Sequence, residues 1–134
     1  MSSNTMTVSF PGGKRVNASY EGFEIATDQD TDSGGDGSAP EPFDYFLASL
    51  ATCAGIYVLG FCQKRDIPYD GISLKQSWER EEKTNRLAAV HISIEVPSGF
   101  PDKYHNALVR AVSQCSVKKT LESPPDFIVE TVTV

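Results

Sequence analysis

Hydrophobic and polar residues alternate in three short segments near the start of the chain. In residues 5–10 apolar side chains alternate with threonine and serine, and residues 14–20 and 23–27 repeat the pattern. This period of two is typical of strands with one buried face. A PGG turn separates the first two segments, and Glu21-Gly22 separates the second from the third. The three segments therefore predict an antiparallel meander.

The rest of the chain predicts two helices, a hairpin and a final strand. A long uncharged segment and a second segment with apolar residues at helical spacing predict the helices, and alternation predicts the strands. The expected elements are a loop in residues 28–42, a long helix from Phe43 to Lys64, hairpin strands in residues 69–81 and 87–97, a second helix in residues 100–115 and a strand in residues 126–134. This order predicts a single α+β domain over residues 1–134, without internal repeats.

The long helix contains a stretch without charge, from Tyr45 to Gln63. A run of about 18 apolar residues is long enough to span a bilayer. This run is only mildly apolar, because it is rich in alanine, serine and glycine, and it suits a helix packed closely inside a protein. We therefore expect a buried central helix. Pro42 is suited to an early helical position, and Asp44 to the first turn, where the helix dipole favours an anion.

The loop of residues 28–42 is rich in Asp, Gly, Ser and Pro. Three of its aspartates have the spacing that opens a calcium-binding loop. Such a loop requires glycine at its sixth position and glutamate at its twelfth, where this chain has Ser33 and Ala39. We therefore expect a solvated loop and no metal site.

Composition restricts the class of partner. The 134 residues are 40% hydrophobic and 22% charged, which is ordinary for a globular protein. The net charge of −6 and the pI near 4.8 disfavour nucleic acid and anionic membrane surfaces as partners, because both require a concentrated basic patch. The sequence MSSNTMTVSF has no basic start followed by an apolar run, so we expect a cytoplasmic protein.

Three cysteines are too few and too scattered for a secreted disulfide framework, and no C-x-x-C pair indicates zinc. Cys53 and Cys62 lie nine residues apart, so they project from opposite faces of one helix. Cys115 is on another element, and a contact between Cys53 and Cys115 is possible. Free cysteine usually packs as a small hydrophobic residue, so the spacing alone leaves both packing and reactivity open.

Two motifs surround the first and the last of these cysteines. Residues 34–55 read GGDGSAPEPFDYFLASLATCAG, and residues 112–130 read VSQCSVKKTLESPPDFIVE. Both motifs, together with the order of elements, resemble the OsmC/Ohr family over nearly the whole chain. The resemblance implies an OsmC-like fold, with antiparallel sheets around a long central helix. It also implies an intertwined homodimer with a thiol peroxidase site at the subunit interface.

The resemblance assigns roles to the cysteines. The family's peroxidatic cysteine falls on Cys53 and its resolving cysteine on Cys115, whereas Cys62 has no family role. A peroxidatic thiol reacts as the thiolate and gives a sulfenic acid and an alcohol. The resolving thiol then condenses with the sulfenic acid to a disulfide. We expect no metal or bound cofactor, and an external dithiol reductant that resets the site.

A thiolate in an apolar setting requires a compensating cation or hydrogen-bond donor. In the family an arginine from the first hairpin supplies it, held by an acidic residue at the start of the long helix. Arg15 and Asp44 are the candidates here, with a solvated turn charge and a first-turn charge as the alternative interpretations. The hydroperoxide-specific branch has Pro-Glu ten residues before the cysteine, whereas this chain has Phe43 there. Because about 13 Å of helix separate Asp44 from its own Cys53, Asp44 can act only through a bridging arginine or across the dimer.

The leading hypothesis is a cysteine-dependent peroxidase that reduces organic or hydrogen peroxides through a Cys53 sulfenic acid and a Cys53–Cys115 disulfide. The alternative is a non-catalytic small-molecule-binding or redox-regulatory dimer of the same fold. The missing Pro-Glu pattern keeps this alternative open.

Overall fold

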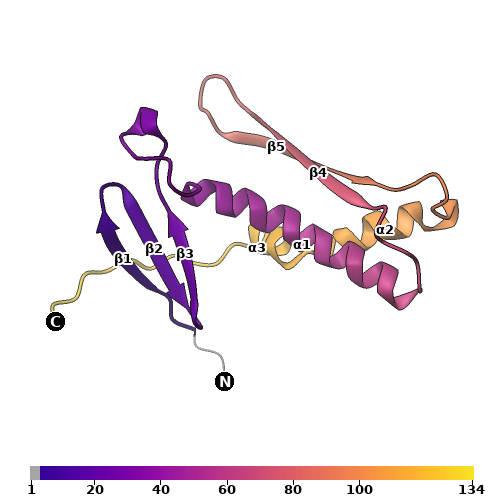
Figure 1. Ribbon diagram of the computed structural model, residues 1–134, viewed down its shortest axis with the longest axis horizontal. Coiled ribbons are helices and arrows are strands. Elements are labelled where there is room, and N and C mark those ends of the chain that lie inside the picture. Colours follow the sequence, from indigo (N-terminus) through magenta and orange to yellow (C-terminus); the bar gives the residue numbers. More distant parts are fainter. Residues whose placement is uncertain (1–3) are drawn as a thin grey trace. The chain divides into compact units, whose positions relative to one another are not determined.

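The computed structural model describes residues 4–134, which form two compact units divided between Ala48 and Ser49. The first unit holds a three-stranded sheet and the second a two-stranded sheet. Helix α1 (Pro42–Lys64) runs through the boundary between them (Figure 1). This mixture of helix and antiparallel sheet confirms the predicted α+β class.

The sheet of the first unit is the meander that the alternating pattern predicted. Its strands pair in the order β1 (Thr7–Gly12), β2 (Arg15–Tyr20) and β3 (Phe23–Thr27). Val8 lies opposite Ala18, and Ala18 lies opposite Ile25, so apolar side chains line up across the three strands. The turn between β1 and β2 contains Gly13 with a φ of 60°, a conformation that glycine adopts without strain.

The loop that precedes α1 is ordered around a buried carboxylate. Asp28 has no exposed surface, and it accepts hydrogen bonds from the Ser38 hydroxyl at 2.6 Å, the Ser38 N–H at 3.0 Å and the Gln29 N–H at 2.8 Å. These bonds, those of Ser38 first, lower the pKa of Asp28 to about 2. A Cβ atom at Gly35 would lie 2.1 Å from the Gln29 carbonyl oxygen, so only glycine fits there. The expectation of a solvated loop is therefore wrong at Asp28, because the loop supplies its own donors to that carboxylate.

Helix α1 begins one residue earlier than predicted and ends at the predicted Lys64. The Asp44 carboxylate accepts a hydrogen bond from the Glu41 N–H at 2.9 Å. This is half of a capping box, with Pro42 at the first helical position. The first-turn aspartate thus stabilises the start of the helix.

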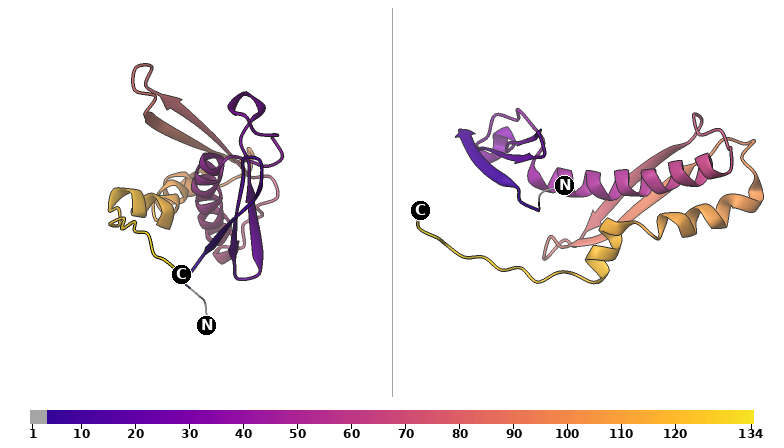
Figure 2. Two further views of the ribbon diagram at one scale, coloured as in Figure 1. Left: turned by 90° about the vertical axis from the view of Figure 1, so that its left-hand side faces the viewer. Right: turned by 90° about the horizontal axis from the view of Figure 1, so that it is seen from below.

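The second unit packs a hairpin and two short helices on α1. Its elements are β4 (Ser73–Arg80), β5 (Leu87–Glu95), the 3₁₀ turn η2 (Asp102–Tyr104), α2 (His105–Val112) and α3 (Ser116–Glu122). Helices α2 and α3 run beside the part of α1 that belongs to this unit (Figure 2). The buried core contains Val58, Phe61, Cys62, Phe100 and Leu108. The hairpin and the second helix are confirmed, although the latter covers only part of the predicted range.

One face of α1 is buried and the other is not. Leu50, Ala54, Val58 and Cys62 recur every four residues and are all buried, whereas Ile56 is 58% exposed. By length and composition alone α1 is apolar enough to cross a membrane, and a third of its most apolar window is buried. One such helix is weak evidence for a membrane span, because the core helix of a soluble protein has the same properties. The expected burial of this helix is confirmed for one face.

The last residues of the chain do not form the predicted strand. Residues 124–134 have no regular secondary structure. Their apolar side chains are exposed, Phe127 by 85% and Val129 by 94%. A strand gains its stability by pairing with another strand, and this segment pairs with none in the described chain. The alternating pattern identified a segment suited to a sheet, but the single chain does not provide the sheet.

Candidate functional site

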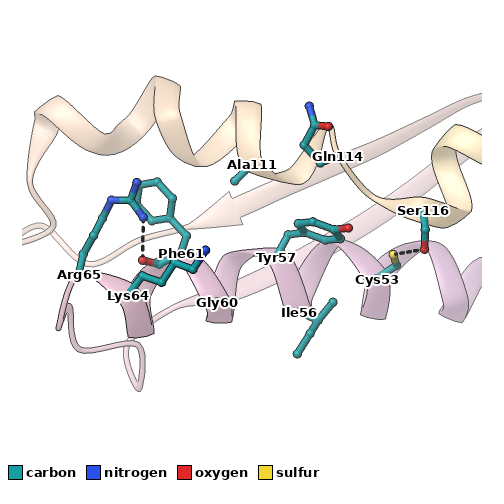
Figure 3. Close-up of a pocket in the computed structure, with 10 residues that line it drawn as sticks. All are labelled: Cys53, Ile56, Tyr57, Gly60, Phe61, Lys64, Arg65, Ala111, Gln114 and Ser116. Atoms are coloured by element: carbon teal, nitrogen blue, oxygen red, sulfur yellow. Dashed lines mark hydrogen bonds between the residues drawn. The ribbon is translucent and has the colours of Figure 1, made fainter.

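Cys53 faces the start of α3. It lies on α1 and is partly buried, and its sulfur is 3.8 Å from the Ser116 hydroxyl oxygen (Figure 3). Cys115, the residue just before α3, is buried and has a free thiol. The interaction between the two thiols lowers the pKa of Cys53 and raises the pKa of Cys115. The fold therefore brings the two cysteines together, as the predicted roles require.

The surroundings of Cys53 favour its thiolate. Burial raises the pKa of the thiol, but the Cys115 thiol, the Val117 N–H and the Ser116 hydroxyl and N–H donate toward the sulfur and together bring the pKa below its usual value. None of these four groups is a cation. The start of α3 thus provides the donors that the sequence analysis required for Cys53.

The pKa of Cys115 shifts in the opposite direction. Burial raises it, and the hydrogen bond that its thiol donates to Cys53 raises it further, because donation requires the protonated form. Of the two thiols, Cys53 is therefore the one that ionises more readily. This is the order of acidity that the predicted roles of the two cysteines require.

Cys62 lies in a different environment. It is completely buried in the core of the second unit. Burial raises the pKa of its thiol, and the charge of Arg65 lowers it by less. A buried, protonated thiol is inert, in keeping with the packing role predicted for Cys62.

A groove of about 660 Å³ extends from Cys53 along α1. Cys53 and Ser116 lie at one end of it, and Lys64 and Arg65 lie at the other (Figure 3). The lining between these ends is mainly apolar and consists of Ile56, Tyr57, Gly60, Phe61, Ala111 and Gln114. The groove is large enough for a small organic molecule that reaches the sulfur of Cys53.

Arg15 and Asp44 do not form a pair in the first unit. The Arg15 guanidinium binds the Asp36 carboxylate at 2.8 Å and the Ser38 hydroxyl at 3.2 Å, whereas Asp44 caps α1. The sequence offered no signal for Asp36 as the partner of Arg15, because the two residues are 21 positions apart and Asp36 lies in a loop that was expected to be solvated. The catalytic roles of Arg15 and Asp44 stay predictions.

Sequence reasoning missed the donors around Cys53. Ser116 follows Cys115 directly, and a serine at the first position of a helix after a cysteine was an available signal. The sequence analysis gave Lys64 as the end of the long helix and assigned no role to Arg65. The place of both residues in a groove depends on how α2 packs. Among residues 4–134, no group of three or more His, Cys, Asp or Glu side chains is placed to hold a metal ion.

Comparison with known proteins gives one family for most of this chain. The family described as OsmC-like protein matches residues 35–130, a span that includes both Cys53 and Cys115. No curated protein matches the sequence significantly.

Several solved structures share the fold. A protein from Psychrobacter arcticus 273-4 that is assigned to osmotic stress induction and detoxification response is 25% identical, with a TM-score of 0.74 over 90% of this chain and 89% of that one. An OsmC-like protein from Mycoplasma pneumoniae is 16% identical, with a TM-score of 0.70 over 90% and 87%. An organic hydroperoxide resistance protein from Legionella pneumophila is 19% identical, with a TM-score of 0.57 over 87% and 88%. The fold that the two cysteine motifs implied is confirmed.

Proposed function

This chain belongs to the OsmC-like protein family, and from that membership we propose that it is a cysteine-dependent peroxidase that reduces organic or hydrogen peroxides. The family match and the solved relatives named for hydroperoxide resistance support a redox or peroxide-related role. The observation that carries the finer proposal is the pairing of a Cys53 thiol of lowered pKa with a Cys115 thiol of raised pKa.

The first chemical step is the attack of the Cys53 thiolate on the distal oxygen of the peroxide. The O–O bond breaks, the alcohol leaves as ROH after taking up a proton, and Cys53 becomes a sulfenic acid. The Cys115 sulfur then attacks the Cys53 sulfur, and the hydroxyl group leaves as water with the proton of Cys115. The sum is ROOH plus two thiols giving ROH, water and one disulfide. An external dithiol restores both thiols by disulfide exchange.

The working form of the protein is a cytoplasmic homodimer. The exposed apolar residues of the segment 126–134 support this proposal, because an isolated soluble chain rarely exposes so many in a row. Pairing of this segment as a strand in the dimer would bury them and satisfy its backbone groups.

A second candidate function is a non-catalytic small-molecule-binding or redox-regulatory dimer. The observation that favours it is the engagement of Arg15 by Asp36 and Ser38, which leaves Cys53 with uncharged donors. A thiolate without a neighbouring cation is less stabilised, and its reaction with peroxide is slower.

Peroxide consumption by the purified protein separates the two functions. We expect turnover of cumene hydroperoxide or hydrogen peroxide with dithiothreitol or dihydrolipoamide as the reductant, and no turnover by Cys53→Ser. Cys115→Ser is expected to accumulate a Cys53 sulfenic acid that dimedone traps. Absence of turnover with either peroxide and either dithiol, in a protein whose Cys53 thiol is intact, would favour the binding function.

A further inference from the structure

A second cavity, which we call the rear pocket, is lined by Cys115 and not by Cys53. Its volume is about 300 Å³, and its walls come from α1, β5, α2 and α3. The lining is mainly aliphatic and includes Ala54, Ile92 and Val109, with Lys118 as its one charged residue. All the lining residues belong to the second unit, so the packing of that unit alone forms the pocket.

The groove and the rear pocket divide the two cysteines between them. Cys53 lines the groove, Cys115 lines the rear pocket, and the two cavities share no lining residue. Neighbouring positions follow the same division. Ala111 and Ser116 line the groove (Figure 3), whereas Val109 lines the rear pocket. A molecule in the groove therefore meets Cys53, and a molecule in the rear pocket meets Cys115.

This division matters for the reduction of a Cys53–Cys115 disulfide. A thiolate that reduces a disulfide attacks one sulfur along the extension of the S–S bond, from the side away from the sulfur that leaves. Attack on Cys53 therefore requires approach through the groove, and attack on Cys115 requires approach through the rear pocket. Cys115 is only 3% exposed, so an external thiol has to enter the pocket to reach it.

The acidity of the leaving thiol favours attack on Cys115. In thiol–disulfide exchange, the thiol of lower pKa leaves faster. Burial raises the pKa of both thiols, but the donors around Cys53 bring its pKa below the usual value, whereas the pKa of Cys115 stays above it. The Ser116 hydroxyl and the amides at the start of α3 are in place to stabilise the Cys53 thiolate as it leaves.

We propose that the external thiol that resets the site enters the rear pocket and attacks the sulfur of Cys115, while peroxide reaches Cys53 through the groove. This assignment rests on the proposed function, because it locates the reducing half of that reaction. In the first step the reductant sulfur bonds to Cys115, the disulfide breaks, and Cys53 leaves as a thiolate. The second thiol of a dithiol then attacks the reductant sulfur bound to Cys115. Cys115 leaves with the proton of that thiol, and the reductant departs as its own disulfide, having given two electrons to the protein.

Lys118 places a cation at the rear pocket. It lines the pocket, and among residues 4–134 it forms no ion pair with a carboxylate. A nearby ammonium favours the thiolate form of an incoming thiol, which is the form that reacts. Its neighbour Lys119 does not line the pocket and donates instead to the Gln114 side-chain oxygen at 2.6 Å. Lys118 is therefore expected to assist reduction, and Lys119 provides a matched control.

Measurement of the two half-reactions separately tests the assignment. Reduced protein is mixed with cumene hydroperoxide, protein oxidised with diamide is mixed with dithiothreitol, and mass spectrometry after acid quenching follows the disulfide. Val109 is 59% exposed, and Val109→Trp is expected to obstruct the pocket, slowing reduction about tenfold and leaving oxidation unchanged. Ile56→Trp in the groove is expected to slow oxidation and leave reduction unchanged. Arg110→Trp places the same ring at an exposed position outside both cavities and is expected to change neither rate.

Replacement of the exposed Lys118 tests the pocket without adding bulk. Lys118→Gln is expected to slow reduction by dithiothreitol about threefold at neutral pH, as a change of half a pKa unit in the incoming thiol would. The difference from the wild type is expected to shrink as the pH rises and dithiothreitol ionises without help, which a purely structural defect would not produce. Lys119→Gln is expected to reduce at the wild-type rate at every pH.

The attacked sulfur can be identified with a monothiol. Brief treatment of the oxidised protein with 2-mercaptoethanol, followed by acid quenching, is expected to give a mixed disulfide on the peptide that contains Cys115, with Cys53 free. A mixed disulfide found mainly on Cys53 would overturn the inference, as would an unchanged reduction rate in Val109→Trp or slower reduction in Ile56→Trp.

Two further outcomes are informative. If a second copy of the chain fills the rear pocket, Val109→Trp shifts sedimentation toward the monomer and leaves reduction unchanged, which also overturns the inference. If the variants alter the reduction of the diamide-oxidised protein as expected but cumene hydroperoxide is not consumed, the reductant site stands and the proposed peroxidase function fails.

Discussion

The reactivity of Cys53 depends on uncharged donors at the start of α3. A hydroxyl, a thiol and two backbone amides offset the cost of burying the thiolate. Donors of this kind stabilise an anion less than an adjacent cation does, but two of them are backbone amides that the start of α3 holds in place. Ser116 is the side chain among them that can be changed without altering either cysteine.

Ser116→Ala is expected to raise the pKa of Cys53. The rate of alkylation follows the thiolate fraction, so it rises with pH through the pKa and then levels off. Loss of the hydroxyl is expected to move this midpoint upward and to slow alkylation at neutral pH about threefold, as half a pKa unit would. Iodoacetamide kinetics from pH 5 to pH 10 measure the shift, with Ser113→Ala as the control. Identical profiles for the wild type and Ser116→Ala would show that the hydroxyl does not contribute.

Arg15 is expected to be catalytic although it binds Asp36 in this structure. Exposed ion pairs contribute less than about 1 kcal/mol, so the guanidinium can leave Asp36 at little cost. Arg15→Ala is then expected to raise the pKa of Cys53 and to slow both peroxide reduction and alkylation at neutral pH. Arg15→Lys is expected to recover only part, because lysine keeps the charge without the planar fork that bridges carboxylate and sulfur. If Arg15→Ala keeps the wild-type pH profile, Arg15 is a turn residue without a role in the reaction.

At the level of elements, α1 carries two thiols that serve different purposes. Cys53 lies toward the groove and Cys62 in the core, as the nine-residue spacing predicted. This separation arises because nine residues correspond to two and a half helical turns. The groove and the core therefore respond to different substitutions.

Cys62→Ser is expected to destabilise the protein without changing the chemistry of Cys53. A hydroxyl in place of a buried thiol, with no partner provided, is expected to lower the free energy of unfolding by about 1–3 kcal/mol. Urea denaturation measures this loss, and alkylation of Cys53 in the folded variant is expected to keep the wild-type rate. A peroxidase defect as large as that of Cys53→Ser would mean that Cys62 takes part in the reaction.

For the whole molecule, local pattern predicted most elements, but not the contacts that depend on distant residues. The meander, the long helix and the hairpin follow from alternation and apolar spacing, which act within one segment. The role of Asp28 was missed because its donors lie up to ten residues away in a loop without periodicity. The prediction of a strand in residues 126–134 was wrong for the single chain. Alternation shows which side chains suit a sheet, but it does not show whether a sheet edge is available for pairing.

The site was predicted only in part, again because some of its contacts depend on residues that are distant in the sequence. Motif resemblance selected Cys53 and Cys115, and the structure places them together. Ser116, Lys64 and Arg65 gain their positions from the packing of α2 and α3 against α1, which no local pattern encodes.

Substitution in the C-terminal segment is expected to weaken the dimer. Phe127 and Val129 lie on the same side of an extended chain, and burial of both in a subunit interface would contribute several kcal/mol. The double variant Phe127→Ser, Val129→Ser is expected to shift sedimentation at micromolar concentration toward the monomer, while Thr133→Ser keeps the wild-type distribution. A stable wild-type monomer under the same conditions would contradict the proposed subunit interface.

The proposed peroxidase function depends above all on the reaction of Cys53 with peroxide and on the resolution of the sulfenic acid by Cys115. Mass spectrometry of the reduced protein after one equivalent of cumene hydroperoxide, digested without reductant, tests both steps at once. The predicted result is a disulfide between the peptides that contain Cys53 and Cys115, with the Cys62 thiol intact and one equivalent of alcohol released. Recovery of Cys53 as a free thiol, or as a sulfinic acid with Cys115 still reduced, would contradict it.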